Sequence, residues 1–132
     1  MFTSTINNTV LSREVTMIRK ANECSIKINE HMRGGDGSVR ITNFISGPEE
    51  LLGKGRLFSL ITLEPGCSIG YHVHENESEL FYIIQGSPVY KDGGEEIQVN
   101  AGDVTIVEPG KGHGIANRTE ETCQLVALIL YE

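Results

Sequence analysis

Two histidines and a glutamate form the densest group of potential metal-binding side chains in the sequence. His72 and His74 lie in the stretch GYHVHENESELFYIIQG, residues 70–86, and Glu79 opens its apolar second half. A β-strand turns alternate side chains to the same face, so His72 and His74 are expected to point together. Farther along, His113 lies in EPGKGHGIAN at the start of another predicted strand.

These four side chains are the right types for one metal ion. Imidazole nitrogen and carboxylate oxygen bind Zn, Fe, Mn, Ni or Co at roughly 2.0–2.2 Å, and four protein ligands on an octahedral ion would leave two positions for water or substrate. The alternative is that the histidines are ordinary surface or hydrogen-bonded core residues. His31 is such a lone histidine, and no role is assigned to it. Glu75 and Glu77 are expected to be solvated loop carboxylates.

The segments that would position these side chains are expected to be strands. The predicted strands are rich in β-branched and aromatic residues and are separated by turn motifs. They cover residues 24–31, 38–45, 56–63, 79–85, 95–99, 103–108 and 122–131. The Asp92-Gly93-Gly94 sequence predicts a tight hairpin, and PEELLG, residues 48–53, predicts one helical turn. Short strands with frequent turns predict an all-β sandwich or barrel.

Length and charge limit the classes of function. The chain has 132 residues, enough for one domain, which we expect to span residues 17–132. Residues 1–16 are polar and weakly periodic, and predict an arm that is flexible or crosses to a partner subunit. A net charge of −7 argues against nucleic acid and anionic membrane as partners.

The cellular compartment is predicted to be the cytoplasm. The N-terminal sequence lacks the basic region and apolar block of a signal peptide, and no apolar stretch approaches the roughly 18 residues of a membrane helix. Cys24, Cys67 and Cys123 are scattered and odd in number, which predicts reduced, buried thiols rather than a disulfide framework.

Strand parity divides the side chains around the glutamate between the two faces of the sheet. Phe81 and Ile83 share the parity of Glu79 and are expected to line a pocket, whereas Tyr71 and Tyr82 are expected to face away. Both parities of residues 79–85 are largely apolar, and the same holds for the last strand. A barrel wall that is apolar on its outside needs a cover, so we expect a homodimer.

The spacing around the histidines resembles the two motifs of the cupin family. The first runs Gly66, five residues, His72, one residue, His74, four residues, Glu79, six residues, Gly86. The second motif is matched by a further set of residues, which are Gly102, Gly110, His113 and Asn117. One departure is Glu108, which stands at the usual proline position and is followed by Pro109.

The resemblance implies a fold and a set of ligands. The fold is a double-stranded β-helix, a jelly-roll barrel, with His72, His74, Glu79 and His113 as ligands of one divalent transition metal per chain. Manganese and iron are the commonest metals in such barrels, and zinc, nickel, cobalt and copper are alternatives. The motif glycines are expected in turns, and Asn117 is expected to be a structural hydrogen-bonding residue.

The sequence is also similar to small single-domain cupins described as oxalate-decarboxylase-like. Oxalate decarboxylases themselves have two cupin domains, and Ile69 occupies the position of their substrate-binding arginine. Arg33, Arg40 or Arg56 would have to supply a cation for a carboxylate ligand. The implied function is a metalloenzyme acting on a small carboxylate or oxygenated metabolite, by decarboxylation, oxygen-dependent cleavage or isomerisation. The alternative is a non-catalytic module that binds or senses a small ligand, and no catalytic residue is assigned.

Overall fold

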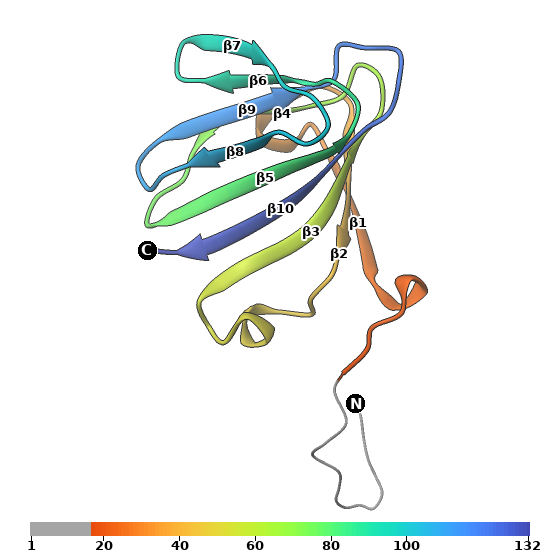
Figure 1. The fold of residues 1–132 in the computed structure, drawn as a ribbon, viewed down its shortest axis with the longest axis vertical. Coiled ribbons are helices and arrows are strands. Elements are labelled where there is room, and N and C mark those ends of the chain that lie inside the picture. Colours follow the sequence, from red (N-terminus) through yellow and green to blue (C-terminus); the bar gives the residue numbers. More distant parts are fainter. Residues whose placement is uncertain (1–16) are drawn as a thin grey trace, which may run out of the picture.

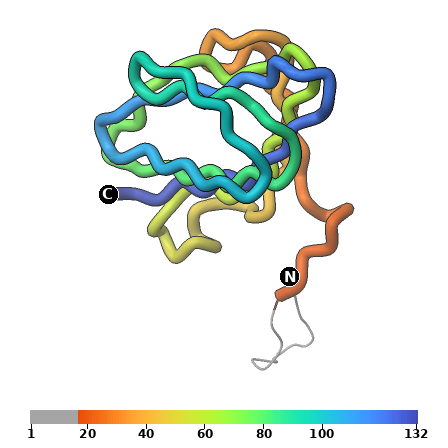
Figure 2. Tube along the Cα trace, turned by 45° about the horizontal axis from the view of Figure 1, so that its top comes forward, coloured from red at the N-terminus to blue at the C-terminus, as the bar shows by residue number. Residues whose placement is uncertain are grey.

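Ten β-strands in two antiparallel sheets make up most of the molecule (Figure 1). The structure is a computed structural model and describes residues 17–132, so the predicted N-terminal arm, residues 1–16, lies outside the described residues. The larger sheet has the order β1 (Ser25–Glu30), β2 (Ser38–Asn43), β3 (Gly55–Leu63), β10 (Cys123–Tyr131), β5 (Glu77–Gln85), β8 (Val104–Val107). The smaller sheet has the order β4 (Ser68–Val73), β9 (Gly112–Ala116), β6 (Val89–Asp92), β7 (Glu95–Gln98). Seen closer to end-on, the chain winds around a common axis (Figure 2).

Helical structure in the described part of the chain is limited to three short 3₁₀ turns. They are η1 (Ala21–Glu23), η2 (Met32–Gly34) and η3 (Pro48–Leu51). The helical turn predicted from PEELLG is confirmed as η3, where Pro48 occupies the first helical turn. Within residues 17–132, no helix is long and apolar enough to cross a membrane.

The alternation of side chains along β10 shows why the sequence forms a sheet with a buried inner face. Cys123, Leu125, Ala127 and Ile129 are buried, whereas the residues between them are only partly covered. This strand lies between β3 and β5 and contributes to the main hydrophobic cluster of the core. The period of two places one apolar row inside the barrel and a second apolar row on its outside.

The strand predictions agree with the structure in position and type. Each of the seven predicted segments contains a strand, and the predicted hairpin is confirmed as β6–β7, in which Asp92 pairs with Glu95 around Gly93-Gly94. The all-β class is therefore confirmed. The largest shift in a strand end near the candidate site is at β5, which begins at Glu77, two residues before the predicted start.

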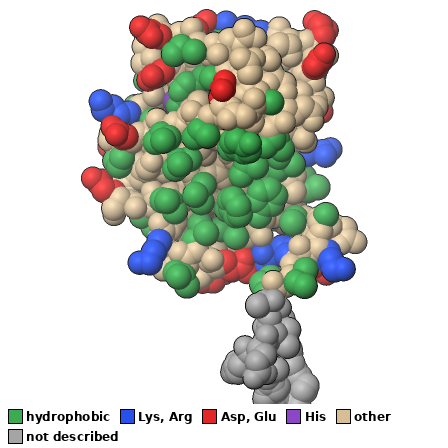
Figure 3. Space-filling view, viewed as in Figure 1, with side chains coloured by type: hydrophobic (Ala, Val, Ile, Leu, Met, Phe, Trp, Pro, Cys, Tyr) green, Lys and Arg blue, Asp and Glu red, His purple; other side chains and the backbone are tan. Residues whose placement is uncertain are grey.

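The outer face of the larger sheet carries a continuous set of hydrophobic side chains (Figure 3). Cross-strand pairs such as Leu80 with Ile106 and Tyr82 with Val104 join neighbouring strands on this face. Ile106 is 61% exposed and Val104 is 57% exposed. We call this surface the outer apolar patch, which consists of Phe58, Leu60, Leu80, Tyr82, Val104, Ile106, Val126 and Leu128. The prediction that these strands are apolar on both faces is confirmed.

Candidate metal centre

Backbone pairing between β4 and β9 brings His72 and His113 together. His72 and His113 are direct cross-strand partners in this antiparallel pair, and a register shift occurs between Ile69 and His72. His74 follows the last residue of β4, where its N–H donates to the carbonyl of Lys111. The smaller sheet and its adjoining turn therefore fix three imidazoles on one side of the barrel interior.

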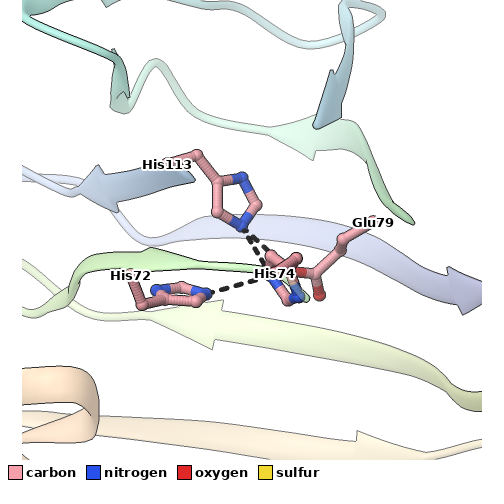
Figure 4. Close-up of side chains that lie close together, drawn as sticks. All are labelled: His72, His74, Glu79 and His113. Atoms are coloured by element: carbon pink, nitrogen blue, oxygen red, sulfur yellow. Dashed lines mark hydrogen bonds and ion pairs between the residues drawn. The ribbon is translucent and has the colours of Figure 1, made fainter. Parts of the chain in front are cut away.

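The carboxylate comes from the opposite sheet. Glu79 lies on β5 with its side chain pointing into the barrel, and its exposed fraction is 6%. Its Oε1 lies 2.9 Å from Nε2 of His74 and 3.0 Å from Nε2 of His113. One donor atom from each of His72, His74, Glu79 and His113 lies within 4.8 Å of all the others (Figure 4). The structure thus brings together all four side chains that the sequence indicated.

Each imidazole is oriented through its other nitrogen. Nδ1 of His72 donates to the carbonyl of Gly70 at 2.8 Å, and Nδ1 of His74 donates to Oε2 of Glu77 at 2.7 Å. Nδ1 of His113 lies 2.9 Å from the hydroxyl of Tyr90. Hydrogen bonds of this kind fix the tautomer and the ring plane of metal-binding histidines, and they leave Nε2 with a free electron pair.

The close contact between the rings of His72 and His74 shows whether a metal fits this group of side chains. Nε2 of His72 lies 3.1 Å from Nε2 of His74, and Nε2 of His74 lies 3.2 Å from that of His113. In neutral His72 and His74 the single ring proton is already on Nδ1, so two electron pairs face each other with no proton between them. A cation bound by both nitrogens would turn this contact into an attractive one. The donor set therefore fits a divalent transition metal.

The electrostatics of the group favour a negatively charged glutamate. Burial raises the pKa of Glu79, but hydrogen bonds with His113 and His74 outweigh it, so its pKa is lowered from the usual 4.5. The pKa of His74 is raised, chiefly by its hydrogen bond with Glu79 and then by Glu77. Burial lowers the pKa of His72. Glu79 is thus a carboxylate anion at neutral pH.

The prediction for one of the two loop glutamates was wrong. Glu75 is exposed, as expected, but Glu77 is the first residue of β5 and its side chain is only 12% exposed. It accepts two hydrogen bonds from Arg56, of 2.8 and 2.7 Å, as well as the one from His74. Arg56, followed by His74, lowers the pKa of Glu77 to about 2 against the cost of burial. The available signal was parity, because Glu77 and Glu79 are two positions apart on one strand.

Tyr90 is a second residue that the sequence analysis missed. It lies on β6, is 7% exposed, and its hydroxyl is the only partner found for Nδ1 of His113 among residues 17–132. Burial raises the pKa of Tyr90, so the phenol stays protonated. Phe81 stacks on the other side of the His113 ring with centroids 4.9 Å apart. The only indication of Tyr90 in the sequence was an aromatic residue in a predicted hairpin.

A small pocket of about 70 Å³ opens onto three of the four donors, His72, His74 and Glu79. Its other walls are mostly apolar, formed by Met32, Ile41, Leu57, Ile61, Ile69, Phe81 and Ile129, with Arg33 and Arg56 as its only other charged residues in the described chain. Phe81 lines the pocket as predicted, whereas Ile83 is fully buried in the core and is not part of the lining. Tyr71 and Tyr82 face away from the site, as predicted, and both are exposed.

The remaining motif residues are structural. Asn117 is buried and donates hydrogen bonds to the carbonyls of Leu63 and Glu121, which confirms its predicted role. The motif glycines adopt the left-handed conformation, and at Gly86 a Cβ would lie 2.6 Å from Sγ of Cys123. His31 contacts the carbonyl of Gly35 and takes no part in the metal centre.

Comparison with known proteins identifies the family. The family model of the cupin domain matches residues 59–129 of the sequence, and these include all four donors. The chain belongs to the cupin family. An oxalate-binding protein of Thermotoga maritima is 35% identical over 114 residues, which cover 86% of this cupin and 93% of the relative.

Solved structures agree with this assignment. The crystal structure of a predicted oxalate decarboxylase from Thermotoga maritima matches this cupin with a TM-score of 0.83 and 34% identity, covering 88% of this chain and 100% of the other. A sugar phosphate isomerase from Silicibacter pomeroyi matches with a TM-score of 0.71 at 17% identity, covering 88% and 76% of the two chains, and shows the fold alone. The predicted double-stranded β-helix and the resemblance to oxalate-decarboxylase-like cupins are thereby confirmed.

Proposed function

We propose that the protein binds one divalent transition metal, manganese or iron, and through it a small carboxylate. One observation carries the proposal. Nε2 of His72 and Nε2 of His74 face each other at 3.1 Å while both Nδ1 protons are donated elsewhere. Glu79 and His113 complete a donor set that leaves two positions on an octahedral ion. The similar protein named for oxalate binding supports a carboxylate as the ligand.

The pocket favours binding over catalysis. Apart from His72, His74 and Glu79, the titratable residues that line it in the described chain are Arg33 and Arg56. Arginine stays protonated at neutral pH and does not act as a general acid or base. Glu77 adjoins His74 but has a pKa of about 2, so it is ionised and carries no proton to deliver. Among the described residues that line this pocket, no side chain besides the donors could protonate a carbon atom in a decarboxylation. We therefore place the binding function ahead of the enzyme.

A metal-dependent enzyme is the second candidate. The open positions on an ion held by four ligands would polarise a bound carboxylate or activate water. The solved structure described as a predicted oxalate decarboxylase, at 34% identity, favours the same class. The substrate classes in question are small carboxylates and oxygenated metabolites.

One experiment tests both candidates. The protein is purified without chelators, loaded with Mn²⁺ or Fe²⁺ and titrated with oxalate by calorimetry, while formate and CO₂ are measured in parallel. We expect saturable binding, a higher melting temperature and no product. Product formation that is lost in His113→Ala would establish the enzyme instead. A metal-loaded protein that binds no small carboxylate would contradict the proposal.

We also propose that the protein is a homodimer in which two copies join through the outer apolar patch. The patch spans β3, β10, β5 and β8, and it includes exposed Val104, Ile106 and Tyr82. Hydrophobic surfaces of this continuity are typical of protein interfaces. A second copy is the proposed partner because the patch has no charged member, so that two copies of a chain with net charge −7 could meet there without placing like charges in contact.

The cysteines support a reducing compartment, and we propose that the protein is cytoplasmic. Cys24, Cys67 and Cys123 are free thiols in the structure. Only Cys123 is buried, whereas the other two are partly exposed, so the prediction of buried thiols holds for one of the three. Partly exposed free thiols persist where glutathione and thioredoxin keep them reduced.

A further inference from the structure

Arg33 lies at the pocket that opens onto the metal centre. It lines this pocket together with His72, His74 and Glu79. No carboxylate of residues 17–132 pairs with Arg33, in contrast to the bidentate pair of Arg56 and Glu77. Arg33 is an exposed residue at the edge of this pocket.

The turn that carries Arg33 is fixed against the strand that carries His72. A Cβ on Gly70 would lie 2.1 Å from the carbonyl oxygen of Arg33, so the two backbones approach as closely as only glycine permits. Asp36 and Ser68 also exchange hydrogen bonds, since each backbone N–H donates to the other residue. Arg33 itself is left-handed, with φ of 55°, a conformation that costs energy and persists where surrounding contacts impose it.

Other candidate cations are excluded by their surroundings. Arg56 already donates two hydrogen bonds to Glu77. Arg40 lies on β2, where its backbone pairs with Ile28 of β1 and Thr62 of β3. It is exposed and does not line the pocket. Ile69, which also lines the pocket, is 4% exposed, belongs to the core and provides no charge. Arg33 is therefore the one unpaired cation at this pocket among the described residues.

Charge and size define the ligand that this arrangement suits. A divalent ion with Glu79 and three neutral imidazoles has a net charge of +1, and Arg33 raises the local total to +2. Arg56 and Glu77 cancel each other. The pocket is small, with a volume of about 70 Å³, and therefore favours a ligand of few atoms. A short dianion matches both the charge and the volume.

We propose that Arg33 binds the second carboxylate of a two-carbon dicarboxylate whose first carboxylate occupies the open positions on the metal. This inference rests on the proposed function and adds the residue that selects the ligand. The planar guanidinium donates two parallel hydrogen bonds to a carboxylate, so it distinguishes a dicarboxylate from a monocarboxylate of similar size. Ligand selection thus comes from the turn at η2 rather than from the strand that carries the histidines.

The test compares oxalate with acetate on Mn²⁺-loaded protein. Arg33→Asn removes the charge and keeps a residue that tolerates the left-handed conformation, and Arg33→Gln is a second variant. Arg40→Gln is the matched control, because it removes an exposed arginine outside the pocket. Binding constants are measured by calorimetry, and bound manganese is measured in every sample.

We expect both Arg33 variants to retain one Mn²⁺ per chain and to bind oxalate about tenfold or more weakly, with acetate affinity changed by less than about threefold. Arg40→Gln is expected to match the wild type for both probes. Unchanged oxalate affinity in the Arg33 variants, an equal loss for oxalate and acetate, or loss of manganese in both variants would overturn the role of Arg33. Failure of the manganese-loaded wild type to bind either probe would instead overturn the proposed function.

Discussion

Oε2 of Glu77 accepts a 2.7 Å hydrogen bond from Nδ1 of His74. The same carboxylate accepts two hydrogen bonds from Arg56, so one chain of contacts leads from β3 through β5 to the end of β4. The glutamate holds the imidazole in the tautomer and orientation that present Nε2 to the metal centre. Arg56 in turn keeps that glutamate ionised and in place.

Replacement of this glutamate should weaken metal binding without removing a ligand. We expect Glu77→Ala to reduce the affinity for Mn²⁺ about tenfold or more, which is typical for the loss of such a supporting contact. Glu75→Ala is the control, since Glu75 is an exposed neighbour of the same chemistry. The measurement is a competition titration with a metal-binding dye. Equal affinities in the two variants would show that Glu77 does not position His74.

A second supporting contact is tested at Tyr90. Tyr90→Phe removes the hydroxyl that lies 2.9 Å from Nδ1 of His113 and leaves that buried nitrogen without its partner. We expect Mn²⁺ affinity to fall about tenfold and the free energy of unfolding to fall by about 1–3 kcal/mol. Tyr71→Phe removes the same group from an exposed ring and should have little effect on either quantity. Chemical denaturation and metal titration provide the two measurements.

Metal binding should stabilise the folded protein through the four donors together. At a Mn²⁺ concentration of about 100 times the dissociation constant, we expect a gain of about 2.7 kcal/mol and a correspondingly higher melting temperature. The double variant His72→Ala with His74→Ala should lose both the bound metal and this gain. His31→Ala should retain them, because His31 lies outside the metal centre. Stoichiometric metal in the double variant, measured by elemental analysis, would refute the assignment of these ligands.

The pKa shifts predict how metal affinity depends on pH. A histidine must be deprotonated at Nε2 to bind the metal, so protons compete with the ion. The pKa of His74 is raised above 6.5, chiefly by its hydrogen bond with Glu79, so this competition begins above pH 6.5 as the pH falls. Burial lowers the pKa of His72, and its competition sets in only below pH 6.5.

We therefore expect the affinity for Mn²⁺ to fall as the pH falls. Each bound ion should displace one proton near neutral pH and more than one in more acidic buffer, so the decline becomes steeper there. Titrations between pH 8 and pH 5 at constant ionic strength provide the test. An affinity that is constant over this range would contradict the assignment of the imidazoles as ligands.

The outer apolar patch predicts the assembly state. Light scattering should give about twice the chain mass of 14.5 kDa for the wild type. Introducing charge with Ile106→Asp and Tyr82→Asp together should give the mass of a single chain, because both side chains lie on the patch. Ile97→Asp is the control, since Ile97 is 44% exposed on β7 of the other sheet. A monomeric wild type at micromolar concentration would exclude the proposed dimer.

Strand alternation and motif spacing predicted the architecture and the four donors because both are local properties. A period of two fixes which side of β5 Glu79 faces, and the same rule placed Phe81 at the pocket and Tyr82 outside. The contacts that support the donors depend on pairing between distant strands. Tyr90 reaches His113 only because β6 pairs with β9, and this pairing was not visible in the sequence.

Turn geometry marks the other limit of prediction. The 3₁₀ geometry of η2 was not predicted, because its sequence MRG contains no helical pattern and Arg33 adopts a left-handed conformation that is rare outside glycine. As a result, the sequence offered Arg33, Arg40 and Arg56 as equal candidates, whereas the structure separates them by their partners and positions. Likewise, β5 begins two residues earlier than predicted, so Glu77 lies in the barrel wall and not in the predicted loop.

The four donors come from both sheets, since Glu79 lies on β5 and the three histidines lie on or beside β4 and β9. An ion bound to all of them would cross-link the two walls beside the small pocket. Local unfolding of β4 and β9 would then require the bonds between the metal and its ligands to break first. Amide protons of β4 and β9 should therefore exchange with solvent more slowly once metal is bound. The same cross-link would make β4, β9 and their adjoining turns harder for proteases to cut.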